Sequence, residues 1–294
     1  MILYLSSLPK KIVEAIGEID PDAEVNVLRT YADREEDILD IAINRPQNIK
    51  NLSLDSGTFS FNNAKTPHTD KSIDLFGDLL KKHYGKFDGG VFNFDEYFGA
   101  GGTQVNYANQ LHLMSRGIPV IPVIQDIKEV DYYIENSEKY PYVAIGSGCR
   151  KDYRKGKSSK VIKDMVKRLY KAGIKVHLFA EMSYNFLKDI PVYSADAKSW
   201  LDWSTRRICC FFDEEKEKEV QLFLDLVTKR GEPNKKYYKK HPQCEAYEKW
   251  LDENFGWKIT DLFLENRLTI VNAYYYCLLA KRIEAKHKEL GVFD

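Results

Sequence analysis

The chain carries no excess charge of either sign. Its 294 residues contain 44 lysines and arginines and 44 aspartates and glutamates. A protein without net charge has no overall field that draws it onto a polyanion. Any contact with nucleic acid must therefore come from local basic patches.

The sequence also lacks a signal peptide, a membrane span and a disulfide framework. The apolar run at its start has no basic region before it and no small-residue cleavage site after it, and no later run reaches the roughly 20 apolar residues that cross a bilayer. Five scattered cysteines, an odd number, argue against paired disulfides. We predict a cytoplasmic protein without membrane contact, with reduced thiols at Cys149, Cys209, Cys210, Cys244 and Cys277.

The first two-thirds of the chain alternates short β-branched or aromatic runs with amphipathic stretches. This alternation is typical of βαβ units that build a parallel sheet. The stretch 158–172 shows it best, with an apolar stripe at helical spacing and a glycine after it. Further helices are expected at 72–84 and 103–116, and strands at 2–6, 51–55, 90–95, 119–125, 142–146, 175–180 and 191–196, with 207–212 as an eighth candidate.

No glycine-rich nucleotide fingerprint follows the first strand, and GAGGT at 99–103 fits neither a Walker loop nor a Rossmann turn. Seven or eight β/α units favour an α/β protein of the (β/α)8 TIM-type barrel class over an open doubly wound sheet. We expect the barrel to occupy residues 1–212, and a helical section, residues 213–294, to pack on it.

Polar side chains end four of the expected strands. They are Asp55, Asp95, Gln125, which Asp126 follows, and Asp196. In a parallel barrel the carboxyl ends of the strands form the active face, where neighbouring carboxylates shift each other's pKa. A strand-end aspartate is often only a helix cap or turn former, but four such positions favour a shared site.

The same strand ends carry a family resemblance. DSGTF at 55–59 resembles the DSGGFQ motif of tRNA-guanine transglycosylases, FDE at 94–96 resembles their FDEC, and VIQ at 123–125 resembles IVQG. YVAIG at 142–146 is similar to GLAVGE, and VHLF at 176–179 lies where that family has YLMG. The motifs keep the family's order over about residues 50 to 200.

The resemblance implies a double displacement without a cofactor. Asp196 would attack C1′ of a guanosine in a nucleic acid, and Asp55 would carry the proton of the departing and entering bases. Asp95 and Gln125 would read the guanine edge. Further contacts to the base are implied for Ser56, Gly57, Ala144, Ile145 and Gly146, with Tyr97, Phe98 or Tyr142 as stacking partners.

The chain departs from the family at three places. The family's Cys-x-Cys-x-x-Cys and His zinc site is missing, because Cys209, Cys210, Cys244 and His241 are spaced irregularly, so no structural zinc is predicted. Ser147 replaces the family's glutamate, which favours a nitrile-bearing or bare 7-deazaguanine. YSADAKSW also replaces FDCVLPTR around the nucleophile. These departures resemble the branch that inserts 7-deazaguanines into DNA.

The sequence leaves the substrate, the oligomeric state and the function open to alternatives. The substrate is DNA by preference or else tRNA, and the protein is a monomer or a homodimer. An unrelated TIM-barrel sugar or phosphosugar enzyme and an inactive nucleic-acid-binding barrel also fit the pattern. Basic residues for a phosphate backbone are expected in RKGK at 154–157 and at Lys235, Lys236, Lys239 and Lys240.

Overall fold

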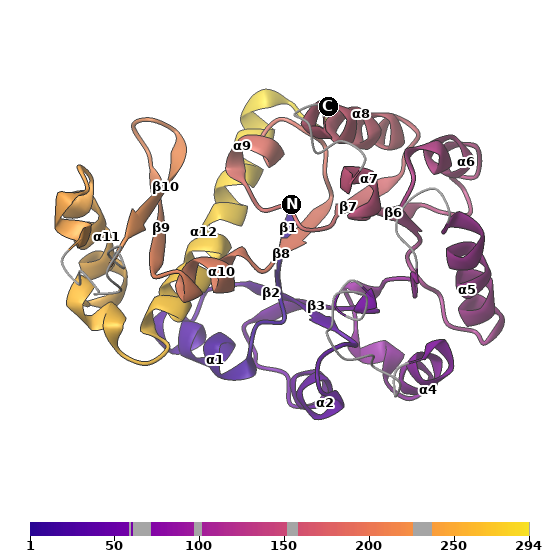
Figure 1. Ribbon diagram of the computed structural model, residues 1–294, viewed down its shortest axis with the longest axis horizontal. Coiled ribbons are helices and arrows are strands. Elements are labelled where there is room, and N and C mark those ends of the chain that lie inside the picture. Colours follow the sequence, from indigo (N-terminus) through magenta and orange to yellow (C-terminus); the bar gives the residue numbers. More distant parts are fainter. Residues whose placement is uncertain (59, 61–71, 97–101, 152–157, 226–236, 294) are drawn as a thin grey trace, which may run out of the picture.

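A parallel sheet of eight strands forms the centre of the computed structural model, which describes residues 1–58, 60, 72–96, 102–151, 158–225 and 237–293 (Figure 1). Neighbouring strands follow the order β4-β3-β2-β1-β8-β7-β6-β5. The strands are β1 (Ile2–Ser6), β2 (Val25–Thr30), β3 (Ile49–Asp55), β4 (Gly90–Val91), β5 (Val123–Ile124), β6 (Tyr142–Ile145), β7 (Lys175–Leu178) and β8 (Ser194–Ala197).

The sheet is curled, and its two edge strands approach each other. Phe92, just after β4, forms an isolated parallel bridge with Ile121, just before β5. The amide of Asn93 donates to the Ile121 carbonyl at 2.9 Å, and the amide of Ile121 donates to the Val91 carbonyl at 2.8 Å. Apolar side chains from several strands fill the inside of the curl: Tyr4, Leu28, Phe92, Val123 and Ala144.

Helices cover the outside of the sheet (Figure 1). The predicted stripe of α8 is confirmed, since Ile162, Met165, Val166 and Leu169 are buried and Gly173 after the helix has a positive φ. The helices are α1 (Lys10–Ile19), α2 (Glu35–Ile43), α4 (Ile73–His83), α5 (Thr103–Ser115), α6 (Val130–Glu135), α7 (Gly148–Lys151), α8 (Ser158–Lys171), α9 (Tyr184–Leu187), α10 (Ser199–Thr205), α11 (Cys244–Phe255) and α12 (Arg267–Leu290).

One strand of the sheet was not predicted from the sequence, and another predicted strand lies outside the sheet. β2 was not predicted, because its apolar residues are interrupted by Asn26 and by Arg29, which is buried but paired. The eighth candidate was wrong as a sheet strand. It forms β9 (Ile208–Asp213), which pairs only with β10 (Lys218–Phe223), antiparallel and in a separate two-stranded sheet.

Residues 213–294 were expected to be helical, but they also contain the strand β10. The β9–β10 hairpin and α11 share a small apolar core at one end of the molecule in Figure 1. The long helix α12 contributes Leu268 and Val271 to this small core and also packs on the main core beside α1, α10 and β1. The boundary at residue 212 falls inside β9 and stays a prediction.

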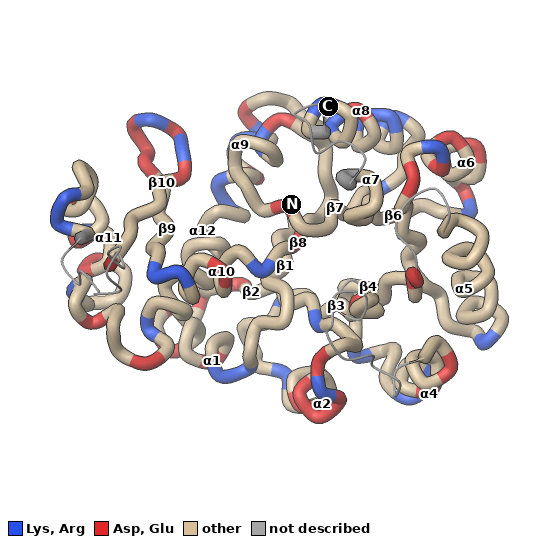
Figure 2. Tube along the Cα trace, viewed as in Figure 1, with Lys and Arg blue, Asp and Glu red and all other residues tan. Residues whose placement is uncertain are grey.

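Charges of both signs are interspersed along the outer helices (Figure 2), in keeping with the balanced composition. Within the described ranges, no helix has the length and apolarity needed to cross a membrane.

Candidate functional site

A cavity of about 490 Å³ lies at the carboxyl ends of the sheet strands. Because parallel strands deliver their last residues to one edge of the curl, each of the eight strands or the loop after it contributes to the lining. The predicted residues that line it are Asp55, Ser56, Asp95, Gln125, Gly146 and Asp196. The other lining residues are Ser6, Ser7, Leu28, Thr30, Thr58, Ser60, Ser147, Phe179, Ala180, Ala197, Lys198, Ser199 and Asp202.

Asp196 is held on both carboxylate oxygens. Its Oδ2 accepts a hydrogen bond from Ser6 Oγ on the neighbouring strand β1. Its Oδ1 lies 3.3 Å from Nε2 of His177 on β7, and the backbone amide of Ala180 donates to the same oxygen at 3.2 Å. The side chain is buried and lines the cavity. It is therefore an acceptor whose orientation is fixed by donors from two adjacent strands.

Asp95 and Gln125, which follow the two edge strands β4 and β5, form a buried pair. Gln125 Nε2 donates to Asp95 Oδ2 at 2.6 Å, and the amide of Gly148 donates to Gln125 Oε1 at 2.8 Å. Asp95 Oδ1 is buried without a hydrogen-bond partner. Burial raises the pKa of Asp95 well above its usual range, and the nearby charge of Asp55 adds to this. This oxygen is therefore free to accept a hydrogen bond from a ligand or from water.

Gly146 is required next to this pair because a Cβ at its position would overlap the carboxamide of Gln125. The backbone after β6 can thus approach Gln125 closely and leave room for a planar group in the cavity.

Asp55 is the last residue of β3, and its carboxyl group is partly buried in the cavity wall. Burial raises the pKa of Asp55 from 3.8 to about 7, and the charge of Asp196 acts in the same direction. The hydrogen bond from the Gly57 amide to Asp55 Oδ2, 3.0 Å long, opposes this rise, as does Lys198. A carboxyl group that titrates near neutral pH can both give and take a proton.

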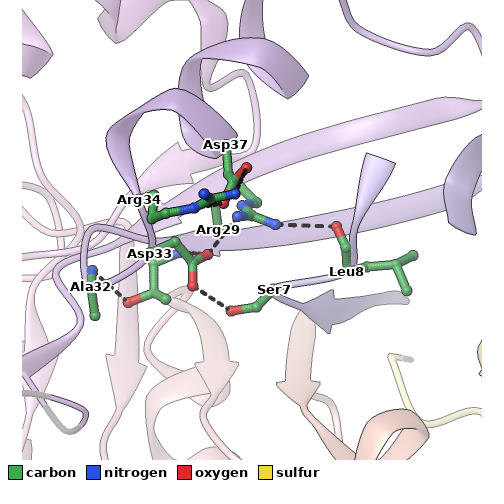
Figure 3. Close-up of polar contacts among 8 residues, drawn as sticks. Ser7, Leu8, Arg29, Ala32, Asp33, Arg34 and Asp37 are labelled. Atoms are coloured by element: carbon green, nitrogen blue, oxygen red, sulfur yellow. Dashed lines mark hydrogen bonds and ion pairs between the residues drawn. The ribbon is translucent and has the colours of Figure 1, made fainter. Parts of the chain in front are cut away.

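The rim of the cavity near β1 and β2 is supported by a buried ion pair (Figure 3). The Arg29 guanidinium lies 2.8 Å from Asp33 Oδ2 and donates to the Leu8 carbonyl at 3.2 Å. The other oxygen of Asp33 accepts from Ser7 Oγ at 3.4 Å, and the Thr30 hydroxyl accepts from the Ala32 amide at 3.3 Å. Asp33 therefore joins Ser7, at the end of β1, to the turn that follows Thr30, at the end of β2.

Backbone in the left-handed region recurs around the cavity. Ser7 has φ of 55° and Ala180 has φ of 57°, although neither is a glycine. Gly57, beside the cavity, has φ of 80°. Non-glycine residues in this region cost of order 1 kcal/mol and persist where surrounding contacts hold them, often at functional sites.

Some predicted residues do not reach the cavity. Ala144 and Ile145 are completely buried, Ala144 inside the curl and Ile145 in the outer core, so neither contributes to the lining. Asp126 caps the short helix η2 (Ile127–Glu129) by accepting from the Lys128 amide, the ordinary role of a strand-end aspartate. Tyr142 turns its hydroxyl toward Ser194 and does not line the cavity as a stacking partner.

The basic candidates lie apart from the cavity lining or outside the described residues. Lys239 and Lys240 are exposed in the short helix η3 (Tyr237–Lys240), which contacts β10. Lys235, Lys236, the RKGK segment at 154–157, Tyr97 and Phe98 lie outside the described residues.

Four residues of the cavity lining were not predicted from the sequence: Ser6, Ser7 and Thr30, which bring hydroxyl groups, and Lys198, which brings a positive charge two residues after Asp196. Thr30 was missed together with β2. Ser6, Ser7 and Lys198 were detectable, since each stands at or just after the end of an expected strand. The contact of His177 with Asp196 was not, because it depends on the pairing of β7 with β8.

Within the described ranges, no group of three or more histidine, cysteine, aspartate or glutamate side chains is placed to hold a metal ion. The fold and cavity define an α/β protein with an acidic pocket at the carboxyl edge of a curled parallel sheet. Comparison with protein-family models and with curated proteins gives no match to this chain.

Proposed function

We propose that this protein is a guanine transglycosylase that exchanges guanine in a nucleic acid, DNA in preference to tRNA, for a 7-deazaguanine base. The observation that carries the proposal is the convergence of Asp55, Asp95, Gln125 and Asp196 on one cavity. These residues stand in the family's motif order and offer its four chemical roles. The bridge between the sheet edges supports a closed (β/α)8 barrel as the scaffold.

The base would bind against the Asp95–Gln125 pair. Guanine presents two donors, the ring N1–H and the exocyclic amine, next to one acceptor, O6. The free Oδ1 of Asp95 suits those donors, and two hydrogen bonds donated to it would favour its ionised form on binding. The carboxamide of Gln125 would donate to O6. A 7-deazaguanine shares this edge, so one pocket serves both the departing and the entering base.

Asp196 would be the nucleophile. Its carboxylate forms a bond to C1′ while the bond from C1′ to N9 of guanine breaks, and Asp55 gives its proton to the departing base, which leaves neutral. The entering 7-deazaguanine then gives its N9 proton to ionised Asp55 and attacks C1′, which releases the Asp196 carboxylate. The pKa of Asp55 near 7 supports this two-way proton transfer.

Ser147 affects which 7-deazaguanine can bind, and two exposed lysines could contact the nucleic acid. Ser147 lines the cavity beside Gly146 and offers no carboxylate to an aminomethyl ammonium, which favours the nitrile-bearing or bare 7-deazaguanine. Lys239 and Lys240 are exposed and available to a phosphate backbone. The preference for DNA rests on the resemblance to the DNA-modifying branch.

The test is a trapping experiment with guanine-containing DNA and tRNA oligonucleotides in the absence of free base. Wild-type protein should form a denaturation-resistant adduct that a 7-deazaguanine discharges. Asp196→Asn should abolish the adduct, and Asp55→Asn should slow both its formation and its discharge. Asp202→Asn is the matched control, because Asp202 lines the same cavity without a proposed role. An adduct that survives in Asp196→Asn contradicts the assignment.

One observation favours a second candidate, a phosphosugar enzyme. Lys198 and Ser199 follow β8, and barrels often hold phosphate groups at the loops after their last strands. Mass spectrometry of nucleosides from DNA and tRNA of cells that express the protein separates the two. A 7-deazaguanine nucleoside in either polymer supports the guanine transglycosylase. Its absence from both polymers favours the phosphosugar enzyme.

A further inference from the structure

A chain of buried polar side chains runs from Asp196 into the inside of the curled sheet. His177 on β7 is completely buried, and its Nε2 lies 3.3 Å from Asp196 Oδ1. Its Nδ1 lies 2.8 Å from Ser194 Oγ, which lies 2.7 Å from the hydroxyl of Tyr142 on β6. Three adjacent strands, β6, β7 and β8, thus contribute one connected set of hydrogen bonds.

Aromatic rings surround the imidazole of His177. The rings of Phe92 and Phe179 each lie 4.5 Å from it, centroid to centroid, and that of Tyr4 lies 6.0 Å away. A polar ring fixed in such a place is oriented by its hydrogen-bond partners, because rotation would bury unpaired nitrogen atoms.

The partners also fix which nitrogen carries the proton. An ionised Asp196 only accepts, so Nε2 of a neutral imidazole must donate and Nδ1 must accept. Ser194 then donates to Nδ1 and accepts from Tyr142, whose phenol keeps its proton because burial raises the pKa of Tyr142 far above its usual range. The hydrogen bonds therefore run in one direction, from Tyr142 through Ser194 and His177 to Asp196.

We propose that His177 is a positioning residue for Asp196, and that it holds Oδ1 so that Oδ2 is the oxygen that attacks C1′. Oδ1 has two donors, Nε2 of His177 and the amide of Ala180, whereas Oδ2 has the Ser6 hydroxyl. The oxygen with fewer donors keeps more of its electron density for bond formation. This inference rests on the proposed function.

The contact between His177 and Oδ1 of Asp196 would also assist the second half of the exchange, in which the Asp196 carboxylate is released. Once Oδ2 is bonded to C1′, Oδ1 becomes the carbonyl oxygen of the ester and regains negative charge as the carboxylate leaves. Donors already aimed at Oδ1 stabilise that developing charge, which is the principle of an oxyanion hole. Loss of the His177 donor should therefore slow both formation and discharge of the adduct, with little effect on substrate binding.

The experiment compares wild-type protein with His177→Phe, His177→Gln and Ser194→Ala. Phenylalanine keeps the aromatic contacts but removes the donor, and glutamine restores a side-chain N–H. Ser194→Ala removes the hydrogen-bond partner of Nδ1 and so one of the two contacts that hold the ring in place. His112→Phe is the control, since His112 is exposed on α5 and its Nε2 lies 2.8 Å from the exposed Asp74, away from the cavity lining. Circular dichroism and melting curves establish that each variant is folded.

We expect His177→Phe to lower the maximal rate of adduct formation and of discharge by about 100-fold, the lower end of the range for one lost oxyanion-hole donor. The oligonucleotide concentration at half-maximal rate should change less than about twofold, and glutamine should restore most of the rate. A wild-type rate in folded His177→Phe overturns the proposal. If that variant does not fold, a wild-type rate in Ser194→Ala overturns it instead.

A spectroscopic measurement separates this proposal from the proposed function. Nitrogen-15 NMR of histidine-labelled wild-type protein should show the tautomer of His177 protonated on Nε2. The tautomer protonated on Nδ1 overturns the proposal whether or not an adduct forms. If the tautomer is as expected but no adduct forms with DNA or tRNA, the arrangement around Asp196 is supported and the transglycosylase function is rejected.

Discussion

Replacement of Asp55 by asparagine should stabilise the protein, and the gain should grow with pH. Burial raises the pKa of Asp55 from 3.8 to about 7, so the folded protein favours the protonated form. The stability that protonated Asp55 contributes is fully present below pH 3.8 and is lost as the pH rises through 7. Asparagine carries no charge at any of these pH values, so it avoids this loss. Its side-chain oxygen can still accept from the Gly57 amide.

The size of the effect follows from the two pKa values. The difference between 3.8 and about 7 is about three pH units, and each unit corresponds to about 1.36 kcal/mol, which gives at most about 4 kcal/mol. About 3 kcal/mol of this should develop between pH 5 and pH 8.5, most of it below pH 7, because there Asp55 is ionised in the unfolded chain but still protonated in the folded protein.

Urea denaturation followed by tryptophan fluorescence measures the effect at intervals of half a pH unit. Asp22→Asn is the control, because Asp22 is exposed, and its free energy of unfolding should follow that of the wild-type protein at every pH. A difference between Asp55→Asn and wild-type protein that stays constant over the interval, or that falls as the pH rises, would refute the argument that burial holds Asp55 near neutrality.

Three further predictions concern the rim, the base pocket and metals. Asp33→Ala should lower the free energy of unfolding by about 3 kcal/mol, because it leaves the buried Arg29 without its ion-pair partner; a loss below about 1 kcal/mol in urea would contradict this. Gly146→Ala should displace the carboxamide of Gln125 and weaken binding of a 7-deazaguanine at least tenfold in calorimetry while the melting temperature stays within a few degrees; unchanged affinity would argue against the pocket. A chelator should leave adduct formation and the melting temperature unchanged, whereas stoichiometric zinc in the purified protein, with unfolding on its removal, would refute a metal-free fold.

The residues at the strand ends could be predicted from the sequence, because the last residues of parallel strands all lie at the same edge of the sheet. Asp55, Asp95, Gln125 and Asp196 each follow a short apolar run, and helical stretches such as α8 separate the runs. Hydrophobic periodicity and chain connectivity were enough to predict that these side chains line one cavity. Their chemical roles stay proposals.

Local sequence patterns did not predict the residues whose positions depend on contacts with distant parts of the chain. β2 escaped detection because its buried Arg29 depends on Asp33 and on the Leu8 carbonyl, and 207–212 forms a strand that pairs outside the central sheet. Strand pairing also placed His177 and Ser6 on opposite sides of Asp196, at sequence separations of 19 and 190 residues. The sequence by itself determined the alternation of strands and helices and the acidic residues at the strand ends, since both follow from local patterns. The tertiary structure alone decided which donors orient Asp196 and how far burial raises the pKa of Asp55, because hydrogen bonding and desolvation depend on neighbours that only the folded chain brings together.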